Sequence, residues 1–118
     1  MKEVRKITST EKPKIIKYLG DGSYYYNYNI NESKDEDLNI YEYIQVRLWG
    51  KANYNECVKS IIRLYLTIDE EFDLINSANK DLLIGLNSSD SISKYLEYLE
   101  FLNNIKSNVK KDFNQNEK

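Results

Sequence analysis

The spacing of the apolar residues changes once along the chain, and this change limits the fold more than any other feature. Within residues 24–30 and 40–49 side chains alternate between two faces, as they do in a strand with one buried face. After residue 53 apolar residues recur at steps of three and four, as they do on one side of a helix. Strands followed by helices predict a single α+β domain, with the helices packed on one face of an antiparallel sheet.

Three segments are predicted to form a three-stranded antiparallel meander. Residues 14–19 are short and apolar, and the Asp-Gly pair at 21–22 is typical of a tight hairpin turn. Residues 24–30 and 40–50 are rich in β-branched and aromatic side chains, which favour strands. The polar, highly charged segment between them, 31–39, is expected to be a solvated loop.

The alternation divides the aromatic residues of these strands between two faces of the sheet. The face assigned to the core carries Tyr24, Tyr26, Tyr28 and Ile30. The opposite face carries five candidate interaction residues, Tyr25, Tyr41, Tyr43, Arg47 and Trp49. Aromatic side chains beside an arginine are typical of protein interfaces, sugar platforms and single-strand binders. Either this face binds a partner, or its side chains only pack across strands and close the sheet.

Three helices are predicted to follow the strands. Asn53 is a candidate N-cap for the first, and Thr67 with Glu70 matches a capping box at the start of the second. The apolar stripe of the second helix is expected to be Phe72, Ile75, Ala78, Leu82 and Leu86. The last and longest element covers residues 92–113.

Three residues of the last helix lie off its main apolar stripe. They are Tyr98, Phe101 and Ile105. They are therefore expected either to pack inside the chain or to form a seam for a partner helix or a second copy.

Length and charge limit the classes of partner. At 118 residues the chain is expected to form one domain, with flexible ends at 1–12 and 114–118. A net charge of -2 does not favour nucleic acid or a membrane surface as the partner. No apolar run approaches the roughly 18 residues of a membrane span, and the N-terminal residues do not resemble a secretory signal.

Composition also argues against catalysis. The chain has no histidine, which removes the commonest general base and the commonest zinc ligand. The single cysteine, Cys57, lies within a helical apolar pattern and is expected to be a small core residue. The carboxylates at 69–73 fall in the first turn of a helix, where they oppose the positive end of its dipole. We therefore expect no catalytic residues, no metal site and no cofactor.

Four stretches that together cover most of the chain, 7–30, 41–66, 70–80 and 95–109, carry a resemblance to a known family. The chain resembles small uncharacterised proteins from tailed bacteriophages and prophages of gut anaerobes. The resemblance implies a virion component or an assembly accessory, located in the virion or in the cytoplasm of the host bacterium. It implies other phage structural proteins as partners. The alternative is an adaptor or inhibitor that binds a host protein.

Overall fold

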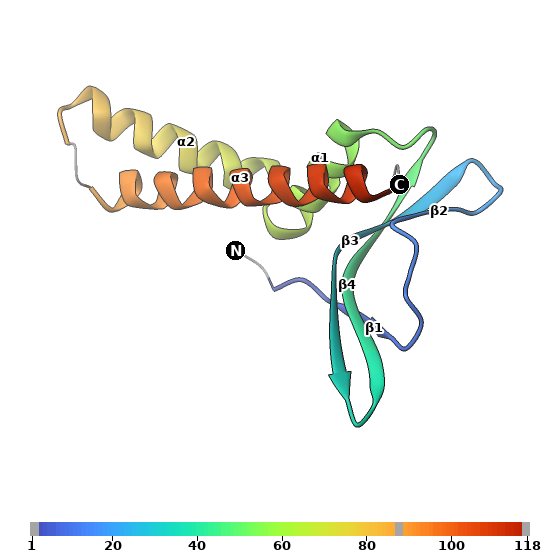
Figure 1. The fold of residues 1–118 in the computed structure, drawn as a ribbon. Helices are drawn as coiled ribbons and strands as arrows, with labels where there is room; N and C mark the ends of the chain where they lie inside the picture. The colour runs from blue at the N-terminus through green and yellow to red at the C-terminus, as the bar shows by residue number, and fades with distance from the viewer. Residues whose placement is uncertain (1–2, 87–88, 117–118) are drawn as a thin grey trace.

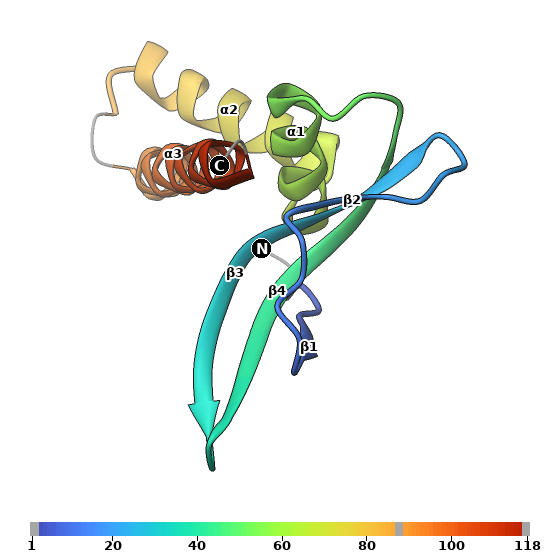
Figure 2. The same cartoon turned by 45° about the vertical axis from the view of Figure 1, so that its right-hand side comes forward.

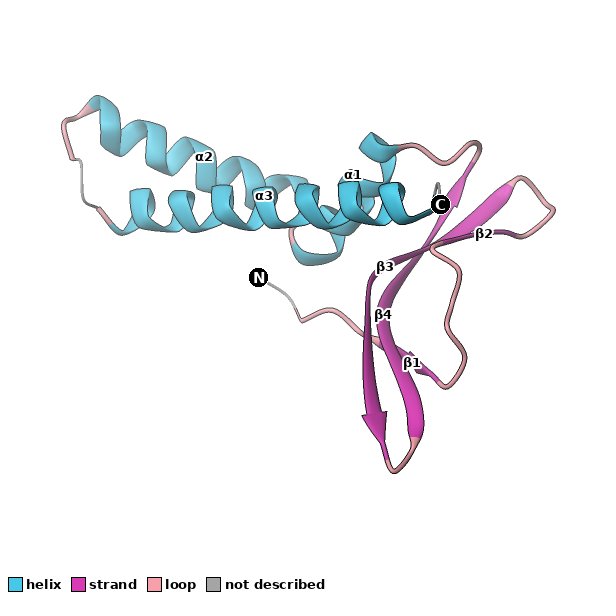
Figure 3. Ribbon diagram, viewed as in Figure 1, coloured by secondary structure: helices cyan, strands magenta, loops and turns pink. Residues whose placement is uncertain are grey.

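The computed structural model describes residues 3–86 and 89–116 and has an α+β architecture, as predicted (Figures 1 and 3). One antiparallel sheet in the order β1-β4-β3-β2 contains β1 (Ile7–Ser9), β2 (Ile16–Tyr18), β3 (Ser23–Asp35) and β4 (Leu38–Trp49). The helices that follow are α1 (Tyr54–Tyr65), α2 (Ile68–Leu83) and α3 (Asp90–Asn116).

The sheet has four strands, so the predicted three-stranded meander is corrected. β1 joins the outer edge of β4, where Ile7 pairs with Tyr43 and Ser9 pairs with Tyr41. A strand of three residues is too short to show an alternating pattern. Its pairing partner lies more than 30 residues away, so no local pattern in the sequence indicates it. β1 lies within the segment 1–12 that we expected to be flexible. Residues 1–2 of that segment, and residues 117–118 of the segment 114–118, fall outside the described residues.

β3 and β4 form a long hairpin that extends past the rest of the sheet as an arm (Figure 2). Much of the segment 31–39, predicted to be a solvated loop, is therefore paired: Asn31 pairs with Glu42 and Asp35 with Leu38. The turn is made by Glu36 and Asp37 at φ 48° and 72°, the left-handed conformation of a two-residue hairpin turn. The sequence did not indicate this turn, because neither residue is glycine or asparagine.

A β-bulge interrupts the alternation of β3. Tyr28 pairs with Ile44 but Asn31 pairs with Glu42, so β3 contains one residue more than β4 between these pairs. Asn29 takes a φ of 53° there.

The bulge exchanges the two faces of β3. Tyr24, Tyr26 and Tyr28 precede it and are buried under the helices, as predicted. Ile30 follows it and lies on the opposite face, where it lines a groove with Tyr41. The prediction that Ile30 shares the core face was wrong, because one extra residue reverses the facing of every residue after it.

The chain between β1 and β2 crosses the sheet on the face opposite the helices (Figures 1 and 2). β1 and β2 lie at opposite edges of the sheet, so residues 10–15 must pass over β4 and β3. Asn27 holds this crossover: its Nδ2 donates to the carbonyl of Lys14 (2.7 Å), and its backbone N–H donates to the carbonyl of Ile15 (2.8 Å).

The first two helices begin where the sequence predicts, whereas α3 begins at Asp90, two residues before its predicted start. Asn53 Oδ1 accepts a hydrogen bond from the backbone N–H of Glu56, and Thr67 with Glu70 forms the complete capping box. α3 packs on both α1 and α2, and α1 and α3 cover the sheet. The buried core comprises Tyr24, Tyr26, Tyr28, Ile44, Cys57, Val58, Ile61, Ile62, Ile105 and Val109. The α2–α3 hairpin extends away from this core (Figure 1).

Candidate functional site

Only one end of the predicted interaction face of the sheet is open to solvent. Trp49 is 67% exposed, and the guanidinium of Arg47 lies 5.1 Å from the centroid of its ring. Arg47 is anchored by Asp21, with 2.7 Å between its Nη2 and the carboxylate, and its Nε donates to Ser23 Oγ. Tyr25 pairs with Arg47 across the strands and is half-buried.

The surroundings of the Asp21 carboxyl group favour its ionised form. Hydrogen bonds from Ser23 hold the pKa of Asp21 below its ordinary value, and the nearby Arg47 charge acts in the same direction. Asp21 therefore stays ionised and keeps the arginine in place beside Trp49.

Tyr41 and Tyr43, predicted to lie on the same face, are buried, each with 8% of its surface exposed. β1 pairs alongside both residues, and the crossover at 10–15 lies over this part of the sheet. The structure therefore separates them from Trp49: they close the second face of the sheet rather than offer a surface to a partner.

The three candidate residues of the last helix also pack inside the chain. Tyr98 is buried, and its hydroxyl donates to Glu71 Oε2 at 2.6 Å. The rings of Phe101 and Tyr65 meet edge to face with centroids 5.2 Å apart, and Ile105 belongs to the core. None of the three forms the exposed seam that we considered.

A buried polar cluster joins α3 to β3 beside the bulge. The carboxylate of Asp112 accepts hydrogen bonds from the hydroxyl of Tyr26 (2.6 Å) and the backbone N–H of Asn29 (3.2 Å). Burial raises the pKa of Asp112 above its ordinary value, although these two hydrogen bonds act in the opposite direction. Asn108 donates to the hydroxyl of Tyr28 one turn earlier. Sequence reasoning missed this cluster, because a lone Asp near the end of a polar helix gives no signal of burial.

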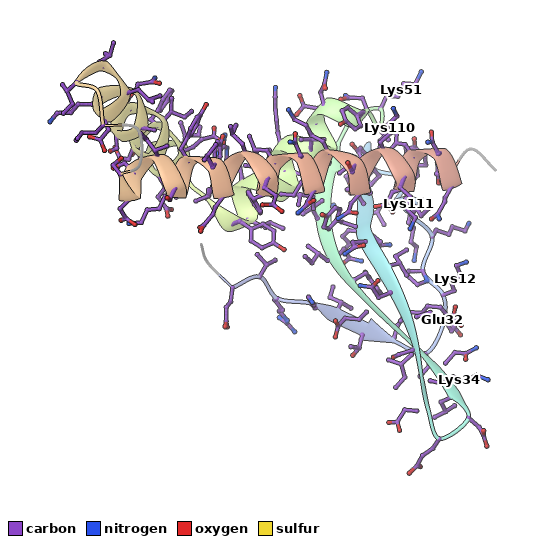
Figure 4. All side chains as sticks on the ribbon, turned by 60° about the vertical axis from the view of Figure 1, so that its left-hand side comes forward. Lys12, Glu32, Lys34, Lys51, Lys110 and Lys111 are labelled. Atoms are coloured by element: carbon purple, nitrogen blue, oxygen red, sulfur yellow. The ribbon has the colours of Figure 1, made fainter. Side chains whose placement is uncertain are left out.

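An open groove of about 610 Å³ lies between the crossover, the arm and the end of α3. Its lining includes Pro13, Ile15, Ile30, Glu32 and Tyr41. Lys12 and Lys14 of the crossover line the groove. Figure 4 also shows Lys34 of the arm and Lys111 of α3 on this side of the molecule. Within residues 3–86 and 89–116, Lys12, Lys34 and Lys111 form no ion pair with a carboxylate, although the Lys111 charge acts to lower the pKa of Asp112.

The largest group of exposed apolar side chains lies on the α2–α3 hairpin. Phe72 is 58% exposed, Leu82 48% and Leu96 60%. Of the five residues predicted as the apolar stripe of the second helix only Ala78 is buried, and Leu86 lies beyond the end of α2 at Leu83. α2 turns a different side toward α3, the side that contains Glu71, Leu74 and Ala78.

The sequence did contain the signal for this exposed side. The 3–4 spacing grouped Phe72, Ile75 and Leu82 on one side of α2, but it could not say which side of the helix α3 covers. We name the residues Ile68, Phe72, Ile75, Leu82, Leu96 and Leu99 the α2–α3 apolar side.

Reactive groups are few in the described part of the chain. No group of three or more metal-ligating side chains gathers among residues 3–86 and 89–116. Burial raises the pKa of the Cys57 thiol to about 11, so at neutral pH it is protonated. No helix in the described ranges has the length and apolar character needed to cross a bilayer.

Comparison with protein-family models, with curated proteins and with solved structures finds no match for this chain.

Proposed function

We propose that this chain is a non-enzymatic phage or prophage protein that acts through contacts with other proteins, as a virion component or an assembly accessory. The observation that supports protein contacts is the α2–α3 apolar side, whose members project from a hairpin that extends beyond the core. Contiguous apolar surface of this kind is expensive to leave in water and is typical of an interface.

The assignment to a phage comes from the sequence resemblance. The stretches that carry it include 41–66, with β4 and α1, and 95–109 of α3. They contain core residues such as Ile44, Ile61 and Ile105, so the resemblance covers the framework of the fold. The proposed locations are the virion and the cytoplasm of the host bacterium.

Quantitative mass spectrometry of purified particles tests this proposal. A virion component is expected at a constant number of copies per particle that survives stringent washing. An assembly accessory is expected in immature particles and to be depleted from mature ones. If the protein is absent at every stage of assembly, the proposal fails.

The lysine-lined groove supports a second candidate function, an adaptor or inhibitor that binds an acidic segment of a host protein. Lys12 and Lys14 line this groove and are exposed, and its apolar floor includes Ile15 and Ile30. Apolar pockets for side chains with positive charge around them fit an extended acidic peptide better than a phosphate backbone.

This alternative predicts binding that weakens with salt and is lost in a variant with Lys12→Glu and Lys14→Glu. The matched control is Lys59→Glu on α1, whose lysine is paired with Glu56 away from the groove. Host-protein binding that is the same in both variants would exclude the groove.

A further inference from the structure

The α2–α3 hairpin has one polar side and one apolar side. On the polar side an open groove of about 510 Å³ is lined by Asp73 and Ser77 of α2 and by Lys94 and Glu97 of α3, among others. At 3.6 residues per turn, the α2 members of the α2–α3 apolar side lie about half a turn from the groove residues of α2. Leu96 and Leu99 lie about half a turn from the groove residues of α3. The exposed apolar residues of both helices therefore lie on the same side of the hairpin.

Nothing in the described chain covers this apolar side along its length. α1 packs against the later part of α3, and the sheet lies beyond α1, so the hairpin is only two helices thick (Figure 1). A pair of helices buries one stripe of each helix, and a second apolar stripe on α2 requires a further layer.

We propose that this layer is a second copy of the chain, with the α2–α3 apolar sides of two copies packed antiparallel as a four-helix arrangement. This inference gives the proposed protein-contact function a specific partner, and so rests on it. α2 has 16 residues, which makes it about 24 Å long, and two helices of about 10 Å width give a footprint of roughly 500 Å² per copy. Two copies then reach the ~1,000 Å² of buried surface that a specific interface needs.

The spacing of the stripe on α2 suits a two-fold axis. Within the helix, the residues at positions 72, 75, 79 and 82 follow steps of three, four and three, which read the same in both directions. An antiparallel copy related by an axis on the apolar side, at the level of residue 77, places Phe72 opposite Leu82 and Ile75 opposite Asn79. Each contact then occurs twice, as a closed two-fold interface requires. The polar amide of Asn79, near the centre, is a device that fixes the register of packed helices.

The charges of α2 also favour the antiparallel orientation. Its first half carries four carboxylates, Asp69, Glu70, Glu71 and Asp73, whereas its second half carries Lys80 and Asp81. Glu70 and Asp73 line the polar groove and Glu71 pairs with Arg63, so these charges lie away from the apolar side, but a parallel copy would still align the two acidic ends. An antiparallel copy places each acidic half beside the half that contains Lys80, and it also opposes the two helix dipoles.

The test is the mass of the purified chain by light scattering over a broad range of concentration. We expect a dimer of twice 14.0 kDa that dissociates on dilution. Leu82→Glu is expected to be monomeric at concentrations where the natural chain is dimeric, because the charge would be buried in the interface. The matched control, Ser77→Glu, introduces the same side chain on the polar side of the same helix and is expected to remain dimeric.

A paired substitution tests the register. Phe72→Lys alone is expected to be monomeric, whereas Phe72→Lys combined with Leu82→Glu is expected to recover association, because each lysine then faces a glutamate of the other copy. Circular dichroism confirms that each variant remains folded, which is expected because both positions are about half exposed.

A natural chain that stays monomeric at all concentrations, or a Leu82→Glu variant that still dimerises, overturns the inference. If the double variant does not recover association, the antiparallel register is wrong. These outcomes do not decide whether the protein belongs to phage particles. If the chain is monomeric but is found in particles at constant copy number, the proposed function stands, and the α2–α3 apolar side binds a different protein.

Discussion

The hydroxyl of Tyr26 in β3 donates a 2.6 Å hydrogen bond to the carboxylate of Asp112 near the end of α3, and both residues are buried. The same carboxylate oxygen accepts the backbone N–H of Asn29 at the bulge. One side chain therefore fixes the last turns of α3 against the point where β3 exchanges its faces. The backbone N–H of Asn29, which the bulge removes from the strand pairing, is therefore hydrogen-bonded to a side chain instead. This explains how the strand can be interrupted inside the sheet.

Replacing Asp112 tests this connection. Asp112→Ala leaves the buried hydroxyl of Tyr26 without an acceptor, which costs about 1–3 kcal/mol in the free energy of unfolding. Asp112→Asn keeps an acceptor oxygen and loses the charge, so it is expected to be less damaging. Urea denaturation of the two variants measures the difference. Equal destabilisation by both would contradict the role of Asp112 as a hydrogen-bond acceptor.

The same residue predicts a pH dependence. Burial raises the pKa of Asp112 in the folded chain, so between its unfolded and folded pKa values the folded state binds more protons. The contribution of Asp112 to stability is therefore highest at acid pH and falls as the pH rises through this window. Asp112→Asn should remove that fall, which a series of urea melts at different pH values would show.

Glu71 is expected to respond to pH in the opposite direction. Burial acts to raise its pKa, but hydrogen bonds from Tyr98 and Arg63 outweigh this effect, and the pKa is lowered. The stability that Glu71 contributes is therefore present above its unfolded pKa and is lost as the pH falls through the folded one. Tyr98→Phe removes one donor and should reduce the acid-induced loss. A variant with the natural acid profile would argue against this coupling.

The turn of the arm offers a stabilising substitution. Glu36 and Asp37 both adopt positive φ, which suits asparagine and glycine better. Replacing the pair by Asn-Gly is expected to raise the free energy of unfolding by about 0.5–1 kcal/mol, since strain is removed at exposed positions. Thermal unfolding measures the gain. The control is Asn-Gly at residues 34–35, within the paired strand, where a loss is expected instead.

Cys57 is expected to be unreactive while the chain is folded. It is fully buried, its Sγ lies 4.0 Å from the hydroxyl of Tyr24, and burial raises its pKa to about 11. A thiol reagent at pH 8 should label it slowly, at a rate set by unfolding, and at once in denaturant. Rapid labelling of the native protein would show that the packing between α1 and the sheet is looser than described.

Local chemistry in the sequence was enough to predict several elements. The cap at Asn53 and the capping box of Thr67 and Glu70 depend on residues three positions apart, so each helix start could be read from a few neighbours. The alternation of Tyr24, Tyr26 and Tyr28 placed one side of β3 in the core, because successive side chains of an uninterrupted strand point to opposite faces.

The candidate interaction residues were less predictable, because periodicity shows which residues share a side but not what covers that side. Trp49 and Arg47 stayed open to solvent, whereas Tyr41 on the same face was covered by a strand and a crossover from the start of the chain. In α2 the spacing grouped Phe72 and Leu82 on one side of the helix, and the packing of α3 on another side left them exposed.

The sequence by itself therefore determined the class of fold, the helix starts and the aromatic core face, since all of these follow from interactions between near neighbours. Only the tertiary structure decided that β1 would join the far edge of the sheet, that the bulge at Asn29 would turn Ile30 outward, and that α2 would keep an apolar side exposed. Each of these depends on contacts between residues far apart in the chain, such as Asn29 with Asp112, and no local pattern specifies which distant surfaces will meet.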